Sequence, residues 1–419
     1  MRKATRLSPA TVIALVALLF AAWSVPAGAA GLRASAPGIT TKTITIGFIA
    51  STQGVAGPNF LNYGKGVQAR FDQQNAAGGV DGRKLQVVSE DDAGNPEADI
   101  TIVQSLLSKG AFGIIIGTPF FFEAYKTPTQ EGIPIVGGGY DGTEWGMKPN
   151  YNMFSTTGDS APTYDVINTG GVDFMKSLGA SCVAGLGYGI SPSSSAAATA
   201  FVKSATAVGM RNCYLDTTIP FGAVNVEPTV LAMKSAGVNA VGLEMDNNTN
   251  FAVLTAAQQS GLKFKAAISA TGYGQSLLND ASALQAARLP GSYFIAEGPP
   301  LTSAPEKAFR AALKKYEGFS GVPGFDWYEG YTQADLMIRG LQAAGRNPTR
   351  QSFITNLRKV KGYTANGLLP NPIDLSLKDF GKAPATECEW YAKVKGTTFV
   401  PVPANGKPVC GKTISVGSS

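Results

Sequence analysis

The residues of this chain offer little material for catalysis. It contains no histidine, which removes the most common general base and the most common metal ligand. Neither the Gly-x-Ser-x-Gly motif of serine hydrolases nor the Gly-x-x-x-x-Gly-Lys-Ser/Thr loop that binds nucleotide phosphates is present. We therefore expect a protein that is not an enzyme, that uses no cofactor and that acts by binding.

The acidic motif Glu90-Asp91-Asp92 could supply paired acids or a metal site. Hard cations require more converging oxygen atoms than three consecutive carboxylates provide. The motif ends a predicted strand and precedes a predicted helix, so we interpret it as a solvated strand end. No metal site is expected.

Two glycine clusters are candidates for dinucleotide-binding loops. Gly137, Gly139 and Gly142 match the spacing Gly-x-Gly-x-x-Gly, but residues 143–151 do not open a helix as that motif requires. Residues 185–189 lead towards a predicted helix but lack the third glycine at its spacing. Neither cluster is predicted to bind a cofactor.

Four cysteines are present, Cys182, Cys213, Cys388 and Cys410, and they permit three disulfide pairings. The two shortest loops favour Cys182–Cys213 and Cys388–Cys410. Metal ligation is the alternative, but the sequence has no Cys-x-x-Cys pair and no histidine.

The chain repeats one local pattern, in which a helix is followed by a glycine and a short apolar strand. The first instance is a strand over 43–49, an amphipathic helix and a strand over 84–88. Further strands are predicted at 112–116, 133–136, 182–186, 212–215, 239–243, 265–268 and 292–296. Strands that alternate with helices indicate parallel pairing, and the Gly-, Asn- and Pro-rich stretch 137–178 separates two such runs. The pattern predicts an α/β fold with two doubly wound parallel-sheet lobes.

The N-terminus has the composition of an export signal. Basic residues precede an apolar run, 10–23, that is too short to span a bilayer comfortably, and Ala27-Gly28-Ala29 offers a small-residue cleavage site. We expect a signal peptide over 1–29, with a retained membrane anchor as the alternative. No cysteine precedes Cys182, which argues against a lipid anchor.

Charge and length limit the class of partner. The formal net charge is +6, and removal of three basic residues with the signal peptide lowers it to +3. The chain has no Lys/Arg run, so nucleic acid is not an expected partner. No later segment is apolar enough to cross a membrane, and the length predicts two domains, each with its own core.

Residues 75–96, NAAGGVDGRKLQVVSEDDAGNP, fix a helix stop, a turn and a strand in one run. This run resembles the first lobe of the leucine/isoleucine/valine-binding protein family, the type I extracytoplasmic (periplasmic) solute-binding proteins of ABC importers. The resemblance implies two lobes joined by a multi-strand hinge, with a ligand cleft between them and an irregular C-terminal tail on the second lobe. The implied crossings lie near 157–162, 297–301 and 360–366. The expected division is signal peptide 1–29, lobe 1 at 42–160 and 300–362, and lobe 2 at 161–299 and 363–419.

The loops that follow strand ends are expected to converge on this cleft. In the first lobe the candidate ligand contacts are Ser51, Gln53, Asn59, Phe60, Phe120, Phe121, Phe122, Gly139, Tyr140 and Asp141. In the second lobe they are Tyr188, Ser191, Asp246, Asn247 and Tyr273. The alternative for Phe120–Phe122 is ordinary packing, and the alternative for Ser191 and for Asp246 is helix capping.

The resemblance departs from the amino-acid-binding members at the ligand. In those members a serine and a threonine hold the ligand carboxylate, and the matching positions here are Phe121 and Asp141. A tyrosine of their second lobe falls near Asp246, and Ala93–Gly94 stands where some members have a first-lobe disulfide. Because an acid and a ring cannot replace hydroxyl donors, we expect a ligand other than a standard branched-chain amino acid. An apolar or aromatic body with a donor or cation facing Asp141 or Asp246 is the expected type.

The expected function is capture of a small molecule by hinge closure and delivery to the permease subunits of an ABC importer of the branched-chain amino acid type. The protein is expected to act as a monomer outside the cytoplasm. Two alternatives remain open: a ligand sensor of the same fold that feeds a membrane receptor, and an exported hydrolase with a Ser/Lys or carboxylate mechanism.

Overall fold

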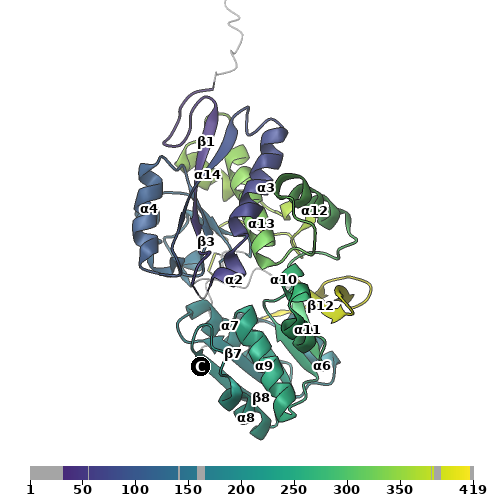
Figure 1. Ribbon diagram of the computed structural model, residues 1–419. Coiled ribbons are helices and arrows are strands. Elements are labelled where there is room, and N and C mark those ends of the chain that lie inside the picture. Colours follow the sequence, from purple (N-terminus) through teal and green to yellow (C-terminus); the bar gives the residue numbers. More distant parts are fainter. Residues whose placement is uncertain are drawn as a thin grey trace, which may run out of the picture. The chain divides into compact units, whose positions relative to one another are not determined.

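Two β-sheets, each with helices on both faces, build the protein (Figure 1). The computed structural model describes residues 32–54, 56–139, 142–157, 166–378, 380–381 and 388–415. Ala34–Ser419 forms one unit, separate from Met1–Arg33. The expected signal peptide and most of the first expected crossing lie outside the described residues. Within the described ranges, no helix combines the length and the apolar character needed to cross a bilayer.

The first sheet has the strand order β2-β1-β3-β4-β5 and is parallel throughout. Its strands are β1 (Thr43–Ala50), β2 (Lys84–Asp91), β3 (Ile114–Gly117), β4 (Ile135–Gly137) and β5 (Met153–Ser155). Side chains of β1 alternate between two cores, because successive residues of a strand point to opposite faces. Ile46 and Phe48 belong to the core that includes α3 (Tyr63–Ala76) and α13 (Phe325–Ala344). Ile49 belongs to the core under α4 (Ala98–Ser108), on the other side of the sheet in Figure 1.

Helices α3 and α13 pack closely, and two features of their sequences make this possible. A Cβ atom at Gly330 would lie 2.1 Å from the carbonyl oxygen of Tyr63, so glycine is required at that crossing. A buried ion pair joins Arg70 Nε to Asp335 Oδ1 at 2.8 Å.

The other helices of this lobe are α2 (Gly57–Phe60), α5 (Lys126–Gln130), α12 (Ala304–Glu317), α14 (Arg350–Leu357) and the short 3₁₀ turns Phe121–Glu123, Glu144–Gly146 and Ala365–Gly367.

The second sheet has the order β13-β12-β11-β10-β9-β7-β8. Strands β7 (Cys182–Tyr188), β8 (Arg211–Ile219), β9 (Ala240–Glu244), β10 (Ala266–Ser269) and β11 (Ser292–Ala296) are parallel. Strands β12 (Cys388–Lys395) and β13 (Thr398–Val402) extend it in antiparallel fashion, and β14 (Val409–Cys410) pairs with β12. A separate antiparallel pair joins β6 (Val166–Asn168) to β15 (Thr413–Ser415).

The helices of the second lobe divide between two cores. Helices α6 (Gly170–Ser177) and α7 (Pro192–Ala207) contribute to the core that contains Val183 and Ile268. On the other face, α8 (Glu227–Ser235) and α9 (Asn247–Ser260) contribute to the core that contains Ala184 and Leu186. Two further helices, α10 (Gln275–Asn279) and α11 (Ala281–Ala287), precede β11.

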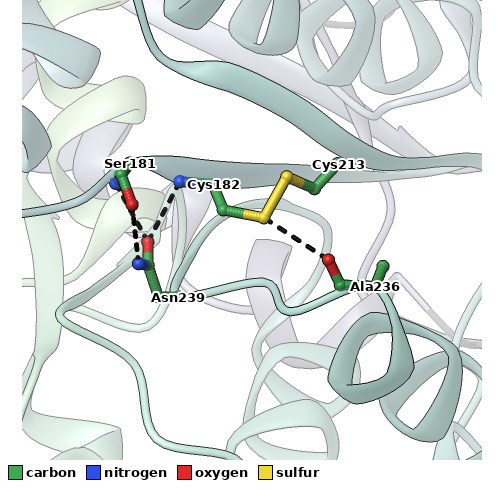
Figure 2. The surroundings of a disulfide bond; sticks show 5 residues. All are labelled: Ser181, Cys182, Cys213, Ala236 and Asn239. Carbon is green, nitrogen blue, oxygen red and sulfur yellow. Dashed lines mark hydrogen bonds between the residues drawn. A yellow bond between two sulfur atoms is a disulfide. The ribbon is translucent and has the colours of Figure 1, made fainter.

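Both expected disulfides, Cys182–Cys213 and Cys388–Cys410, are present. The first joins β7 to its neighbour β8, and Figure 2 shows its surroundings. The side chain of Asn239 holds the start of β7: its Oδ1 atom accepts hydrogen bonds from the backbone N–H groups of Ser181 (3.0 Å) and Cys182 (3.1 Å). The second disulfide lies at the β12–β14 pairing and ties the C-terminal segment to the start of β12.

The expected two-lobed α/β architecture is observed, with two differences in the elements. The stretch 137–178, expected to be a break, contains β5, β6 and α6. The C-terminal tail, expected to be irregular, forms the strands β12–β15. Sequence periodicity missed β5, β6 and β13–β15 because they are short or edge strands, and it missed β12 because that strand is completed by a distant partner, β11.

The position of residues 363–381 also differs from the expected division at 362. Tyr363 pairs with Ile373, and its hydroxyl group donates a hydrogen bond to Asp335 Oδ2 of α13 at 3.0 Å. The ring of Phe380 packs against Tyr151 with 5.2 Å between centroids. Tyr363 and Phe380 therefore pack against elements of lobe 1. The packing arises from buried tertiary contacts that no local pattern signals.

Candidate ligand-binding cleft

A cavity of about 540 Å³ is lined by residues of both lobes. Lobe 1 contributes Asn59, Phe60, Pro119, Gly139 and Phe325. Lobe 2 contributes side chains of β9 to β12, of α6 and α7, and of the loops that follow β7, β8 and β9. Its size and its mixture of apolar and polar lining residues are compatible with a small-molecule site.

Four adjacent strands form the floor of the cavity in the second lobe. Glu244 ends β9, Ile268 lies in β10, Ile295 in β11, and Tyr391 in β12. Tyr391 is paired with Ile295 across the antiparallel β11–β12 register. Glu389 lies two residues before Tyr391 and so points to the same face of the sheet. The floor is therefore the face of the sheet that also packs against α6 and α7.

Helix α7 forms one wall because glycines let it approach the sheet. A Cβ atom at Gly185 would lie 2.4 Å from the carbonyl oxygen of Ala198, and one at Gly242 would lie 2.7 Å from the ring of Phe201. Gly185 therefore serves helix packing, as does Gly187, where a Cβ atom would lie 2.6 Å from the carbonyl oxygen of Ser194. Ser191 caps α7, and its side chain accepts a hydrogen bond from the Ser194 N–H at 3.3 Å. Ser191 also lines the cavity.

Two acidic side chains, Glu244 and Glu389, dominate the electrostatics of the floor. Burial, together with the negative charge of Glu389, raises the pKa of Glu244 to about 7. Burial also raises the pKa of Glu389, against the opposing effect of a hydrogen bond that Glu389 accepts from the Tyr391 hydroxyl. Among the described lining residues there is no lysine or arginine. The site is thus a partly apolar cavity with an uncompensated acidic floor.

Asp246 lies in the cavity wall but is occupied by local hydrogen bonds. It caps α9, where Oδ1 accepts bonds from the N–H groups of Asn248 (2.7 Å) and Thr249 (3.2 Å). Its Oδ2 atom accepts bonds from the hydroxyl groups of Tyr188 and Thr249. The carboxylate therefore holds the Tyr188 ring in position and has little capacity left for a ligand.

Three aromatic rings, those of Tyr188, Phe221 and Phe120, lie next to one another. The ring of Phe221 lies 4.7 Å from Tyr188 and 5.8 Å from Phe120, measured between centroids. Tyr188 and Phe120 are residues of different lobes, so Phe221 joins the two surfaces. Phe221 follows β8 directly and lines the cavity.

The structure places six of the candidate residues on the cavity: Asn59, Phe60, Gly139, Tyr188, Ser191 and Asp246. Tyr140 and Asp141 lie outside the described residues. Phe120 is buried beside Phe221, while Gln53 is exposed.

Five candidates lie elsewhere, each for a packing reason. Ser51 and Phe121 have no exposed surface, and Phe121 is part of the core under α4. Phe122 packs at the edge of the other lobe 1 core, and Tyr273 is buried against Phe399 at 4.4 Å. Asn247 begins α9 beyond the cap. None of these five residues lines the cavity.

The most informative cavity residues outside the set of candidate contacts are Glu244, Glu389, Phe201, Phe221, Phe325 and Tyr391. Glu244 carried a usable signal, since a charged residue at the end of the apolar strand AVGLE is unusual for a buried parallel strand. Glu389 carried none, because only the antiparallel pairing of β12 with β11 brings it to the floor.

The acidic motif at the end of β2 is not part of the cleft. Asp92, expected to be solvated, is 1% exposed and accepts hydrogen bonds from the Thr118 hydroxyl and the Gly94 N–H. Glu90 forms an ion pair with Lys109 at 2.7 Å. In the part of the chain that the structure describes, no three His, Cys, Asp or Glu side chains gather as a metal ion requires.

Comparison with known proteins agrees with this architecture. A family model described as "Periplasmic binding protein" matches residues 43–398. The fatty acid ABC transporter substrate-binding protein from Thermomonospora curvata is 20% identical, with a TM-score of 0.73 over 92% of this chain and 95% of that one. A branched-chain amino acid ABC transporter protein from Thermus thermophilus with bound valine is 18% identical, with a TM-score of 0.70 over 88% and 97%.

A third structure shows that the fold accommodates another type of ligand. The solute-binding protein of an ABC transporter from R. palustris in complex with benzoate is 16% identical, with a TM-score of 0.68 over 89% of this chain and 98% of that one. No curated protein sequence matches this chain. The family model spans most of the sequence, and its fold is the one described above. The chain therefore belongs to the periplasmic binding protein family.

Proposed function

We propose that this protein is exported, captures a small molecule in the cleft and delivers it to an ABC importer of the branched-chain amino acid type. The observation that carries the proposal is the cavity of about 540 Å³ whose walls come from both lobes. A site with walls on two lobes gains contacts when they approach each other, so ligand binding would favour the closed arrangement. Closure would then report occupancy to the permease subunits, and a monomer suffices for this cycle.

The ligand is proposed to differ from a standard branched-chain amino acid. Phe121, at the position of the family's carboxylate-binding serine, has no exposed surface. A ligand carboxylate on the floor would meet Glu244 and Glu389 with no basic side chain among the described lining residues to compensate it. Burying an anion in that position would be costly.

The absence of catalysis is also part of the proposal. One cleft hydroxyl that a hydrolase could use is engaged locally: Ser194 Oγ donates to the Glu244 carbonyl oxygen at 2.5 Å and accepts from the Tyr188 N–H at 2.9 Å. No lysine among the described lining residues could activate a serine.

Native mass spectrometry of freshly purified protein tests the proposal. We expect a population that carries one small molecule, which denaturation releases with unchanged mass. Phe221→Ala should lower the occupied fraction, because it removes the ring between Phe120 and Tyr188. Turnover of ester, amide or glycoside substrates by the purified protein would instead support an enzyme and contradict the proposal.

A further inference from the structure

We infer that the cleft selects organic cations, meaning molecules that carry an ammonium group on an apolar body, and that Glu244 and Glu389 supply the counter-charge. This inference rests on the proposed solute-binding function and specifies its class of ligand. It goes beyond the expectation from sequence, which placed a cation or a donor at Asp141 or Asp246.

The charged side chains among the described lining residues are all acidic. The described lining residues include three carboxyl groups, those of Glu244, Asp246 and Glu389, and no basic side chain. Asp246 is saturated by the N-terminus of α9 and by two hydroxyl groups. The charge available to a ligand therefore belongs to Glu244 and Glu389.

The surroundings of the Glu244 carboxyl group also favour a cationic ligand. Within the described residues, no side chain or backbone group donates a hydrogen bond to it, although it lies on the cavity floor. Its electrostatic neighbour is Glu389, which repels it. A carboxyl group in a concave site that accepts no hydrogen bond is stabilised by a cation that binds in the same site.

Aromatic side chains provide an apolar surface in the same cavity. Six aromatic side chains line the same cavity: Phe60, Tyr188, Phe201, Phe221, Phe325 and Tyr391. The faces of aromatic rings attract ammonium groups, and their area binds an apolar body. The same cavity disfavours an anion, since Glu244 and Glu389 would repel it at the floor.

A thermal-shift screen of the purified protein tests whether the cleft prefers cationic, neutral or anionic ligands. The library contains amines, neutral alcohols and amides, and carboxylates of matched size, including 2-phenylethylamine, 2-phenylethanol and 3-phenylpropanoate. The variants are Glu244→Gln and Glu389→Gln. The matched control is Glu227→Gln, which removes the same charge from an exposed position in the same lobe. The melting temperature of each empty variant verifies that it folds.

We expect stabilisation to be concentrated among the amines. Titration calorimetry of the best amine should give an affinity roughly tenfold to a hundredfold lower in Glu244→Gln or Glu389→Gln, and no change in Glu227→Gln. Stabilisation by neutral or anionic compounds alone would overturn the inference and leave solute binding intact. Equal amine affinity in all variants would also overturn it. Failure of every class to bind would count against solute binding itself.

Discussion

Gly242 of β9 lies directly beneath the ring of Phe201 of α7, so close that a Cβ atom would sit 2.7 Å from a ring carbon. The ring covers the sheet at this point and forms part of the cavity wall. The dimensions of the cleft therefore depend on the absence of a side chain at one position of a strand.

Gly242→Ala should both destabilise the protein and reduce ligand affinity. The new methyl group displaces the Phe201 ring, and overpacking of this kind costs about 1–3 kcal/mol. Urea unfolding measures the first effect, and calorimetric titration of the ligand measures the second. The double variant Gly242→Ala/Phe201→Leu should recover much of the stability. If it recovers none, the loss does not arise from this contact.

The two disulfides should differ in their effect on binding. Removing Cys182–Cys213 with alanines should lower the free energy of unfolding by about 2–4 kcal/mol, since it frees a loop within the second lobe. Affinity should change little, because neither cysteine lines the cavity. Urea unfolding and ligand titration of the same preparation provide both values.

Removing Cys388–Cys410 should weaken ligand binding. The bond fixes the start of β12, and the next residue, Glu389, lies on the cavity floor. Loosening this segment should displace Glu389 and Tyr391. A Cys388→Ala/Cys410→Ala variant with unchanged affinity would show that β12 is held adequately by its pairing with β11.

Asp335→Ala should be among the most destabilising single changes. It leaves Arg70 without its buried ion-pair partner, and it removes the acceptor for the Tyr363 hydroxyl and for Asn366 Nδ2. Breaking a buried pair from one side costs about 3–5 kcal/mol. Lys361→Ala is the control, because its pair with Asp374 is exposed and separated by 4.0 Å, and should cost below about 1 kcal/mol. Similar losses in both variants would refute the distinction.

The stability of the empty protein should fall as pH rises from about 4.5 to about 7. Burial raises the pKa values of Glu244, Glu306 and Glu329 from 4.5 to about 7. In this window the folded state binds more protons than the unfolded state, so deprotonation favours unfolding. Glu244→Gln should flatten the curve of melting temperature against pH, and Glu227→Gln should leave it unchanged. A curve that rises through this window would contradict the assignment.

Local sequence patterns were sufficient for most of the parallel strands, because strands such as β8, β9 and β10 each follow a helix that ends near a glycine. Gly261, for example, has φ 73° and caps α9 just before β10. The same patterns located the loops at the carboxyl ends of the strands, and these brought Asn59, Tyr188 and Asp246 to the cavity.

The remainder of the site depends on tertiary pairing. Glu389 lies on the same cavity floor as Glu244 only because the tail returns as an antiparallel strand beside β11. Phe121 shows the opposite error: its neighbour Phe120 faces Phe221, while Phe121 turns into the core. Within a run of three phenylalanines, composition does not indicate which ring faces the ligand.

A crystal structure of the protein with its bound ligand is the most direct test of a cleft that closes on a small molecule. We predict density for one unaltered molecule between the lobes, in contact with Phe221 and with an ammonium group at Glu244. A ligand bound to one lobe alone, away from Phe221 and Glu244, would contradict this account.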